Sequence, residues 1–124
     1  MLITGAGTVG LLTMLAARAA GATVVVCTDM VAGKRAAATS MGATAALPAA
    51  CTPQEARGAN DGRGYDVCIE CCGAASALRL CVRWSCQRTV ARVAVARVVA
   101  RGSGVWGRGG CHGRWVGGWC AVAS

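Results

Sequence analysis

The amino-acid sequence predicts an α/β fold with a parallel sheet of about four strands and helices on both faces. Two observations support this. Short apolar, β-prone segments alternate with Ala-rich helical segments through the first two thirds of the chain. The strands are continuously apolar, which is typical of parallel strands covered on both faces. Right-handed crossovers then give the spatial strand order 3-2-1-4.

Each element has its own local basis in the sequence. Residues 1–4 are apolar and predict a short first strand, and residues 8–20 predict a helix that Gly21 ends. The β-branched run at 22–29 predicts a buried strand that closes on Asp29. The further expected elements are a helix at 33–41 ended by Gly42, a weak strand at 44–47, a short helix starting at 52–56 with Thr52, Pro53 and Glu55 in capping-box spacing, a strand at 65–73 and a helix at 74–82.

The pattern changes after about residue 83. The 124-residue chain has a formal net charge of +8, and residues 79–124 hold eight Arg and no acidic residue. Residues 84–124 are rich in Arg, Gly, Trp and Cys, and all four Trp of the chain lie there. This low-complexity composition predicts an irregular C-terminal tail.

A glycine-rich motif joins the first strand to the first helix. Residues Gly5-Ala6-Gly7-Thr8-Val9-Gly10 match G-x-G-x-x-G, and Asp29 follows Gly10 by 19 residues at the end of the second strand. In this strand–turn–helix context the motif predicts a dinucleotide site. Gly5 permits the tight turn, Gly7 lets the backbone approach a pyrophosphate, and Gly10 lets the helix pack close to the strand. Residues 1–83 are therefore predicted to be a truncated Rossmann domain.

Asp29 predicts the choice of cofactor. A carboxylate there can accept hydrogen bonds from both hydroxyls of the adenosine ribose and would repel a 2′-phosphate, so NAD is favoured over NADP. Lys34 and Arg35 lie just beyond it. They either touch the adenosine side of the cofactor or form a solvated helix face.

The nine cysteines do not indicate a disulfide framework, because an odd number cannot all pair internally. Cys68, Cys71 and Cys72 form C-x-x-C-C, but on a strand residues three apart point to opposite faces, so buried thiols are favoured over a metal site. His112, the single histidine, is not assigned a role. Residues 1–27 lack the basic region of a signal peptide, so we expect a cytoplasmic protein with no membrane span.

Residues 1 to about 83 resemble the cofactor domain of the zinc-type medium-chain dehydrogenases, and look closest to sorbitol, xylitol and related polyol dehydrogenases. The matching stretches are LITGAGTVGLLTMLAARAAGA, VVVCTD with Lys34 five residues on, MGATAAL and YDVCIECCGAASALRL. The resemblance implies an NAD-dependent oxidoreductase acting on the CH–OH group of a polyol or secondary alcohol. The expected cofactor-binding residues are Gly5, Gly7, Thr8, Val9, Gly10, Asp29, Lys34, Cys71, Cys72 and Gly73.

Departures from the family shape the expected function. The resemblance implies a preceding catalytic domain that carries the zinc ligands, and no part of this chain resembles it. We therefore expect no zinc site and no activity of this chain alone, and we interpret Met1 as the start of a gene model or transcript. The family commonly has Cys-Thr-Gly, near the cofactor, where Cys71-Cys72-Gly73 stands here. Cys72 thus replaces a small hydroxyl residue, and we expect it to weaken one contact with the cofactor. Its Gly-Gly turn and fifth strand are replaced by WSCQRTVARVAV, which indicates an out-of-frame or disordered tail at 84–124.

Two alternatives remain from the sequence. The Arg/Gly/Trp tail could bind nucleic acid or an acidic surface, although nucleic acid is the less favoured partner. The truncated domain could also fold poorly and self-associate through exposed sheet edges.

Overall fold

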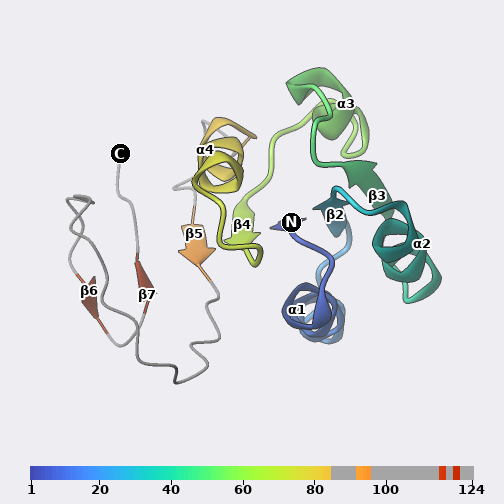
Figure 1. The fold of residues 1–124 in the computed structure, drawn as a ribbon, viewed down its shortest axis with the longest axis horizontal. Helices are drawn as coiled ribbons and strands as arrows, with labels where there is room; N and C mark the ends of the chain where they lie inside the picture. Colours follow the sequence, from blue (N-terminus) through green and yellow to red (C-terminus); the bar gives the residue numbers. More distant parts are fainter. Residues whose placement is uncertain (85–91, 96–114, 117–118, 121–124) are drawn as a thin grey trace.

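The computed structural model describes residues 1–84, 92–95, 115–116 and 119–120. Strands and helices alternate through the first of these segments (Figure 1). The elements are β1 (Leu2–Thr4), α1 (Thr8–Ala19), β2 (Val26–Asp29), α2 (Ala32–Ser40), β3 (Ala45–Pro48), α3 (Pro53–Gly58), β4 (Val67–Glu70), α4 (Ala75–Trp84), β5 (Arg92–Val95), β6 (Trp115–Val116) and β7 (Trp119–Cys120).

The strands β1 to β4 pair in parallel and lie in the order β3-β2-β1-β4, which confirms the predicted order. The register aligns the carboxyl ends of the three inner strands. Thr4 of β1 lies opposite Thr28 of β2 on one side and Glu70 of β4 on the other. The residues that follow these strands therefore meet at one edge of the sheet.

The helices cover both faces of this sheet, with α3 and α4 on one face and α1 and α2 on the other (Figure 1). Successive strand residues point to opposite faces, so β1, β2 and β3 each contribute to two hydrophobic cores. Leu2 packs in the core beneath α3 and α4, whereas its neighbour Ile3 packs in the core beneath α1 and α2. The first core centres on Tyr65, Cys81 and Trp84, and the second on Met14, Val25 and Ala38.

The predicted helix ends are confirmed by the backbone. Gly21 and Gly42 follow α1 and α2 with φ of 91° and 103°, a conformation that glycine adopts without strain. Thr52 caps α3 through the predicted capping box with Glu55. The second strand is shorter than predicted, because only Val26–Asp29 pairs with its neighbours.

The sheet has one strand more than the sequence predicts. β5 pairs in parallel with β4 and extends the order to β3-β2-β1-β4-β5. The expectation that the fifth strand is missing is therefore wrong. The alternating Val of RVAV suits a strand, and β4 would otherwise leave an unpaired edge. β6 and β7 form a separate antiparallel pair, and the rest of the predicted irregular tail lies outside the described residues.

None of the helices in the part of the chain that the structure describes has the length and apolar character needed to cross a membrane.

Candidate dinucleotide site

The candidate site lies where the chain leaves the carboxyl ends of β1, β2 and β4. Two backbone hydrogen bonds hold the three exits together. The N–H of Gly5 donates to the carbonyl of Thr28 at 2.7 Å, and the N–H of Cys71 donates to the carbonyl of Thr4 at 2.8 Å. In open α/β sheets this end, at the point where the strand order reverses, is where ligands bind.

The three motif glycines have different structural roles. Gly5 has a φ of 94°, and a Cβ on it would lie 3.0 Å from the Cβ of Cys72. A Cβ on Gly10 would lie 1.8 Å from the carbonyl oxygen of Gly5, so α1 could not pack this close with any side chain there. A Cβ on Gly7 would meet nothing within 4 Å. The fold therefore requires glycine at positions 5 and 10 but not at position 7.

The start of α1 has the features of an anion site. Gly7 is the N-cap, so no side chain caps the helix, and no acidic residue lies in the first turn. The first turn contains Thr8, Val9 and Gly10, and the N–H groups of a first helical turn have no partner within the helix. Together with the helix dipole, such groups attract phosphate.

Asp29 links the second strand to the glycine-rich turn. Its Oδ2 accepts a hydrogen bond from the N–H of Ala6 at 2.8 Å, and its Oδ1 accepts one from the N–H of Val31 at 2.9 Å. Partial burial acts to raise the pKa of Asp29, but the hydrogen bonds from Val31 and Ala6 oppose it. The charges of Lys34 and Arg35 also oppose it, so the net effect lowers the pKa of Asp29.

Asp29 is therefore ionised at neutral pH. A carboxylate has about four lone-pair positions, so two backbone hydrogen bonds leave capacity for a diol.

Lys34 and Arg35 differ in their surroundings. Lys34 is exposed on α2. Arg35 is half-buried, and its Nη1 donates to the carbonyls of Asp29 at 2.9 Å and Met30 at 2.8 Å. The expectation of a plain solvated helix face is therefore wrong for Arg35, because its guanidinium holds the chain at the end of β2. Met30 itself is 86% exposed beside Asp29, a feature that sequence reasoning missed.

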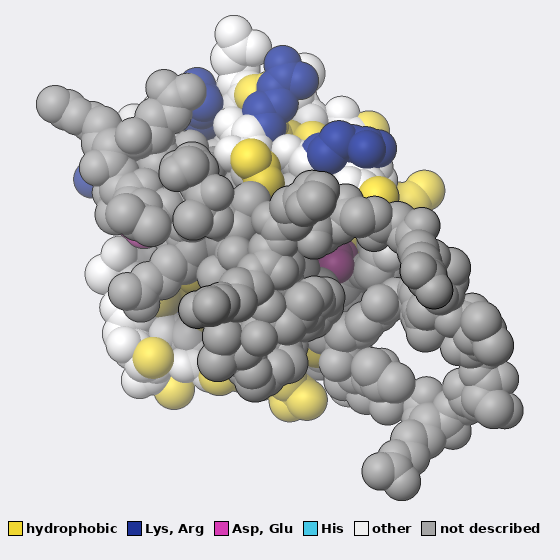
Figure 2. All heavy atoms as spheres, turned by 90° about the vertical axis from the view of Figure 1, so that its left-hand side faces the viewer, with side chains coloured by type: hydrophobic (Ala, Val, Ile, Leu, Met, Phe, Trp, Pro, Cys, Tyr) yellow, Lys and Arg dark blue, Asp and Glu magenta, His cyan; other side chains and the backbone are white. Residues whose placement is uncertain are grey.

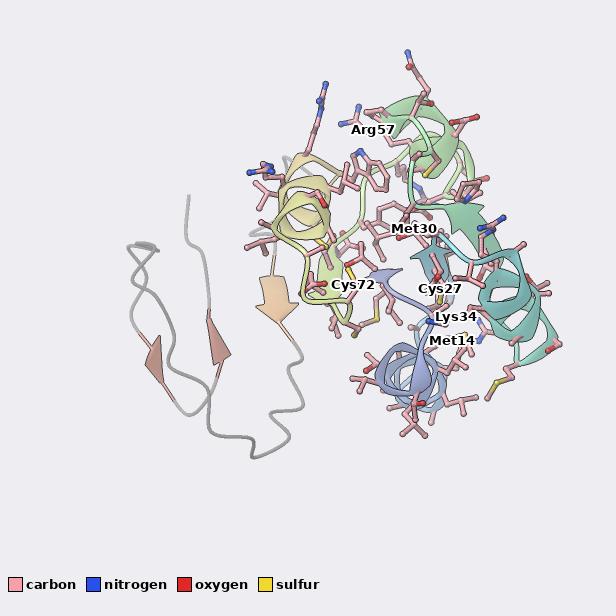
Figure 3. All side chains as sticks on the ribbon, viewed as in Figure 1. Met14, Cys27, Met30, Lys34, Arg57 and Cys72 are labelled. Carbon is pink, nitrogen blue, oxygen red and sulfur yellow. The ribbon has the colours of Figure 1, made fainter. Side chains whose placement is uncertain are left out.

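The cysteines of the C-x-x-C-C segment separate as the strand pattern predicts. Cys68 packs in the core beneath α3 and α4, whereas Cys71 packs against the core beneath α1 and α2. Cys72 is exposed, so the expectation of buried thiols is wrong for this residue, because it follows the end of β4 in an open turn. In Figure 3, Cys72 lies on the β4 side of the glycine-rich turn and Lys34 on the α2 side.

Glu70 is the main site residue that sequence reasoning missed. Its side chain is 3% exposed, and its Oε1 accepts hydrogen bonds from the N–H of Cys72 at 2.6 Å and of Gly73 at 2.8 Å. The available sequence indication was an acid at the end of an apolar strand, followed three residues later by glycine.

A zinc site does not fit the described part of the chain. In that part, no three His, Cys, Asp or Glu side chains come together in a way that could hold a metal ion.

The geometry defines a class of protein. A parallel sheet with the order 3-2-1-4, a glycine-rich turn pressed against the first helix and an acid at the end of β2 are the features of a Rossmann-type dinucleotide-binding domain. The comparison with family models gives the narrower assignment. The model described as "Zinc-binding dehydrogenase" matches residues 8–96, and the chain belongs to this family. The match includes β5.

Solved structures of dehydrogenases share the fold. A zinc-binding dehydrogenase from Sinorhizobium meliloti, bound to NADP, is 34% identical with a TM-score of 0.67, and the match covers 86% of this chain and 32% of that one. A zinc-binding dehydrogenase from Clostridium scindens is 29% identical with a TM-score of 0.69, covering 84% and 30%.

Galactitol-1-phosphate dehydrogenase from Escherichia coli is 25% identical with a TM-score of 0.68, covering 85% and 30%. The chain thus spans about a third of the length of the structures it matches. No curated protein sequence matches it.

Proposed function

We propose that this chain binds the adenosine and pyrophosphate part of NAD and is the cofactor-binding portion of an oxidoreductase. The observation that carries the proposal is the contrast among the motif glycines. Packing and backbone conformation account for Gly5 and Gly10, whereas the space beside Gly7 is open. A ligand that approaches the backbone closely explains why no side chain is present there.

The surrounding residues supply the complementary chemistry. The first turn of α1 offers N–H groups and a partial positive charge to the pyrophosphate. Asp29 accepts hydrogen bonds from the ribose diol. The exposed apolar side chain of Met30, next to Asp29, offers a surface for the flat face of the adenine. The turn at 71–73 bounds the site on the β4 side, and Lys34 contributes a positive charge near Asp29.

The proposed reaction class is hydride transfer between a nicotinamide cofactor and the CH–OH group of a polyol or secondary alcohol. Membership in the zinc-binding dehydrogenase family supports the oxidoreductase class. The similarity to galactitol-1-phosphate dehydrogenase supports a polyol-like substrate. We expect the chain to bind cofactor without turning over substrate alone, since it spans about 30% of that enzyme.

NAD is the proposed cofactor because Asp29 would repel a 2′-phosphate. One solved relative is bound to NADP, and Lys34 and Arg35 place two positive charges near Asp29. The Asp29 carboxylate accepts a hydrogen bond directly from the glycine-rich turn, at the N–H of Ala6. Discrimination between NAD and NADP is therefore expected to depend on Asp29.

A pair of glycine substitutions tests the proposal. Gly7→Ala adds a methyl group to the open space of the site, and Gly33→Ala adds one at an exposed position of α2 that also has nothing within 4 Å. Both variants of the full chain should fold. Only Gly7→Ala should weaken ADP-ribose binding, by about tenfold or more, the scale of one lost phosphate contact. Equal affinity in the two variants would contradict the proposal.

Binding of nucleic acid by the C-terminal tail is a second proposal. The division of the chain into a cofactor-binding domain at 1–83 and a tail at 84–124 is also a proposal. Among the described residues, basic side chains gather at one end of the face shown in Figure 2. The Arg-rich stretch that motivated the alternative lies largely outside the described residues. Steeply salt-dependent RNA binding that is lost on deletion of residues 84–124 would favour it.

A further inference from the structure

Glu70 is a buried carboxylate with an unusual set of partners. Its Oε1 accepts both the N–H of Cys72 and the N–H of Gly73, and its side chain is 3% exposed. The ion pair found among the described residues, between Arg63 and Asp61, does not involve it. Burial of a charge is costly unless its hydrogen bonds compensate. Both hydrogen bonds hold one turn, so the role of Glu70 lies in that turn.

The turn at 71–73 forms a wall against the glycine-rich turn. A Cβ on Gly5 would lie 3.0 Å from the Cβ of Cys72, 3.1 Å from its nitrogen and 3.2 Å from the carbonyl carbon of Cys71. The carbonyl oxygen of Gly5 in turn occupies the space that a Cβ on Gly10 would need. The 71–73 turn therefore leaves no room for a side chain on Gly5, and the Gly5 carbonyl leaves none on Gly10, so the turn held by Glu70, the glycine-rich turn and the start of α1 lie close together.

We propose that Glu70 is a positioning residue for the pyrophosphate site. By fixing the N–H groups of Cys72 and Gly73, it sets the position of the wall against which Gly5 rests, and so the position of the N-terminus of α1. It acts through the backbone and does not contact the cofactor. The inference rests on the proposed function, because it names what holds that same site in shape.

Two substitutions separate the reach of the side chain from its charge. Glu70→Gln keeps the length and a carbonyl oxygen that can accept both N–H groups, but removes the charge. Glu70→Asp keeps the charge but withdraws the carboxylate by one methylene. If Glu70 acts by position, Gln should replace it and Asp should not. If the negative charge itself is what matters, the order reverses.

The readout is the ratio of two affinities in the full chain, measured by ligand-observed NMR. ADP-ribose uses the pyrophosphate site, whereas adenosine reaches only the Asp29 end. Glu70→Asp should weaken ADP-ribose by about tenfold, the scale of one hydrogen bond to a charged group, and leave adenosine unchanged. Glu70→Gln should match the native ratio. A general loss of stability would weaken both ligands together.

Glu55 supplies the matched control. It also accepts a backbone N–H, that of Thr52 at 2.7 Å, but it lies in the capping box of α3. Glu55→Asp should leave the ratio of affinities unchanged. Gly73→Ala disturbs the same turn as Glu70 by a second route, since Gly73 has a φ of 77°. Gly73→Ala should lower the affinity for ADP-ribose relative to adenosine, as Glu70→Asp does. It serves as the test if Glu70→Asp does not fold.

The failures are distinguishable. If the native chain binds neither ligand, the proposed function fails, and this inference fails with it. If the native chain binds ADP-ribose but Glu70→Asp and Gly73→Ala leave the ratio unchanged, or lower both affinities equally, only the positioning role is overturned.

Discussion

The carbonyl oxygen of Gly5 lies 1.8 Å from the position that a Cβ on Gly10 would occupy. The first strand and the first helix are therefore pressed together more closely than any other residue at position 10 allows. This contact sets where the N-terminus of α1 points, and the proposed phosphate site depends on it.

Gly10→Ala should destabilise the chain strongly. The methyl group would have to push α1 away from Gly5, and overpacking of this kind costs about 1–3 kcal/mol and sometimes more. Urea unfolding of the variant and of Gly33→Ala measures the difference. A midpoint for Gly10→Ala equal to that of Gly33→Ala would show that the helix moves away at no cost.

Asp29→Ala should remove discrimination between NAD and NADP. Loss of its hydrogen bonds to the ribose should cost about 1–3 kcal/mol of NAD binding, and removal of its charge should relieve the repulsion of a 2′-phosphate. Calorimetric titration of both cofactors into the native and variant chains provides the comparison. Equal affinity for the two cofactors in the native chain would rule out the assigned role of Asp29.

The same residue predicts a pH dependence of stability. The folded structure lowers the pKa of Asp29, so the unfolded chain binds the proton more readily. The stabilisation is fully present above the unfolded pKa, near 3.8, and is lost as the pH falls through the lower folded value.

Melting temperatures of the native chain and Asp29→Asn should therefore differ by a constant amount between about pH 6 and pH 5, and should converge as the pH falls further, from about 5 to about 2. A difference that stays constant over this range would show that the ionised carboxylate makes no favourable contacts in the fold.

Thiol labelling probes the wall of the site. Cys72 is exposed, whereas Cys27 is fully buried and burial raises the pKa of its thiol to about 11. Iodoacetamide should modify Cys72 at least about tenfold faster than Cys27, because a thiol reacts as an exposed thiolate.

ADP-ribose should slow the labelling of Cys72 more than that of Cys51, which packs against the core beneath α3 and α4. Peptide mapping by mass spectrometry follows each thiol separately. Protection of Cys51 and Cys72 to the same extent would point to global stabilisation instead of occupancy of the site.

The sequence predicted the features that depend on local pattern. Gly5, Gly10 and Asp29 were found because a strand, a turn and a helix are contiguous in the chain, and the strand order followed from crossover handedness. Glu70 was missed because its role arises only when the 71–73 turn folds back over its carboxylate. Arg35 was missed because a guanidinium bonded to backbone carbonyls looks, in sequence, like any charge on a helix.

The fifth strand was missed for a different reason. Composition dominated the interpretation of residues 84–124, in which Arg interrupts the apolar run, whereas pairing with the free edge of β4 determines the structure of Arg92–Val95.

The central claim is that this chain binds the adenosine and pyrophosphate end of NAD. Calorimetric titration of the full chain with ADP-ribose and with NAD tests it most directly. The account predicts binding of both with about equal affinity, because the proposed contacts all lie in the half of NAD that the two ligands share. Absence of binding of either ligand to a chain that melts cooperatively would contradict it.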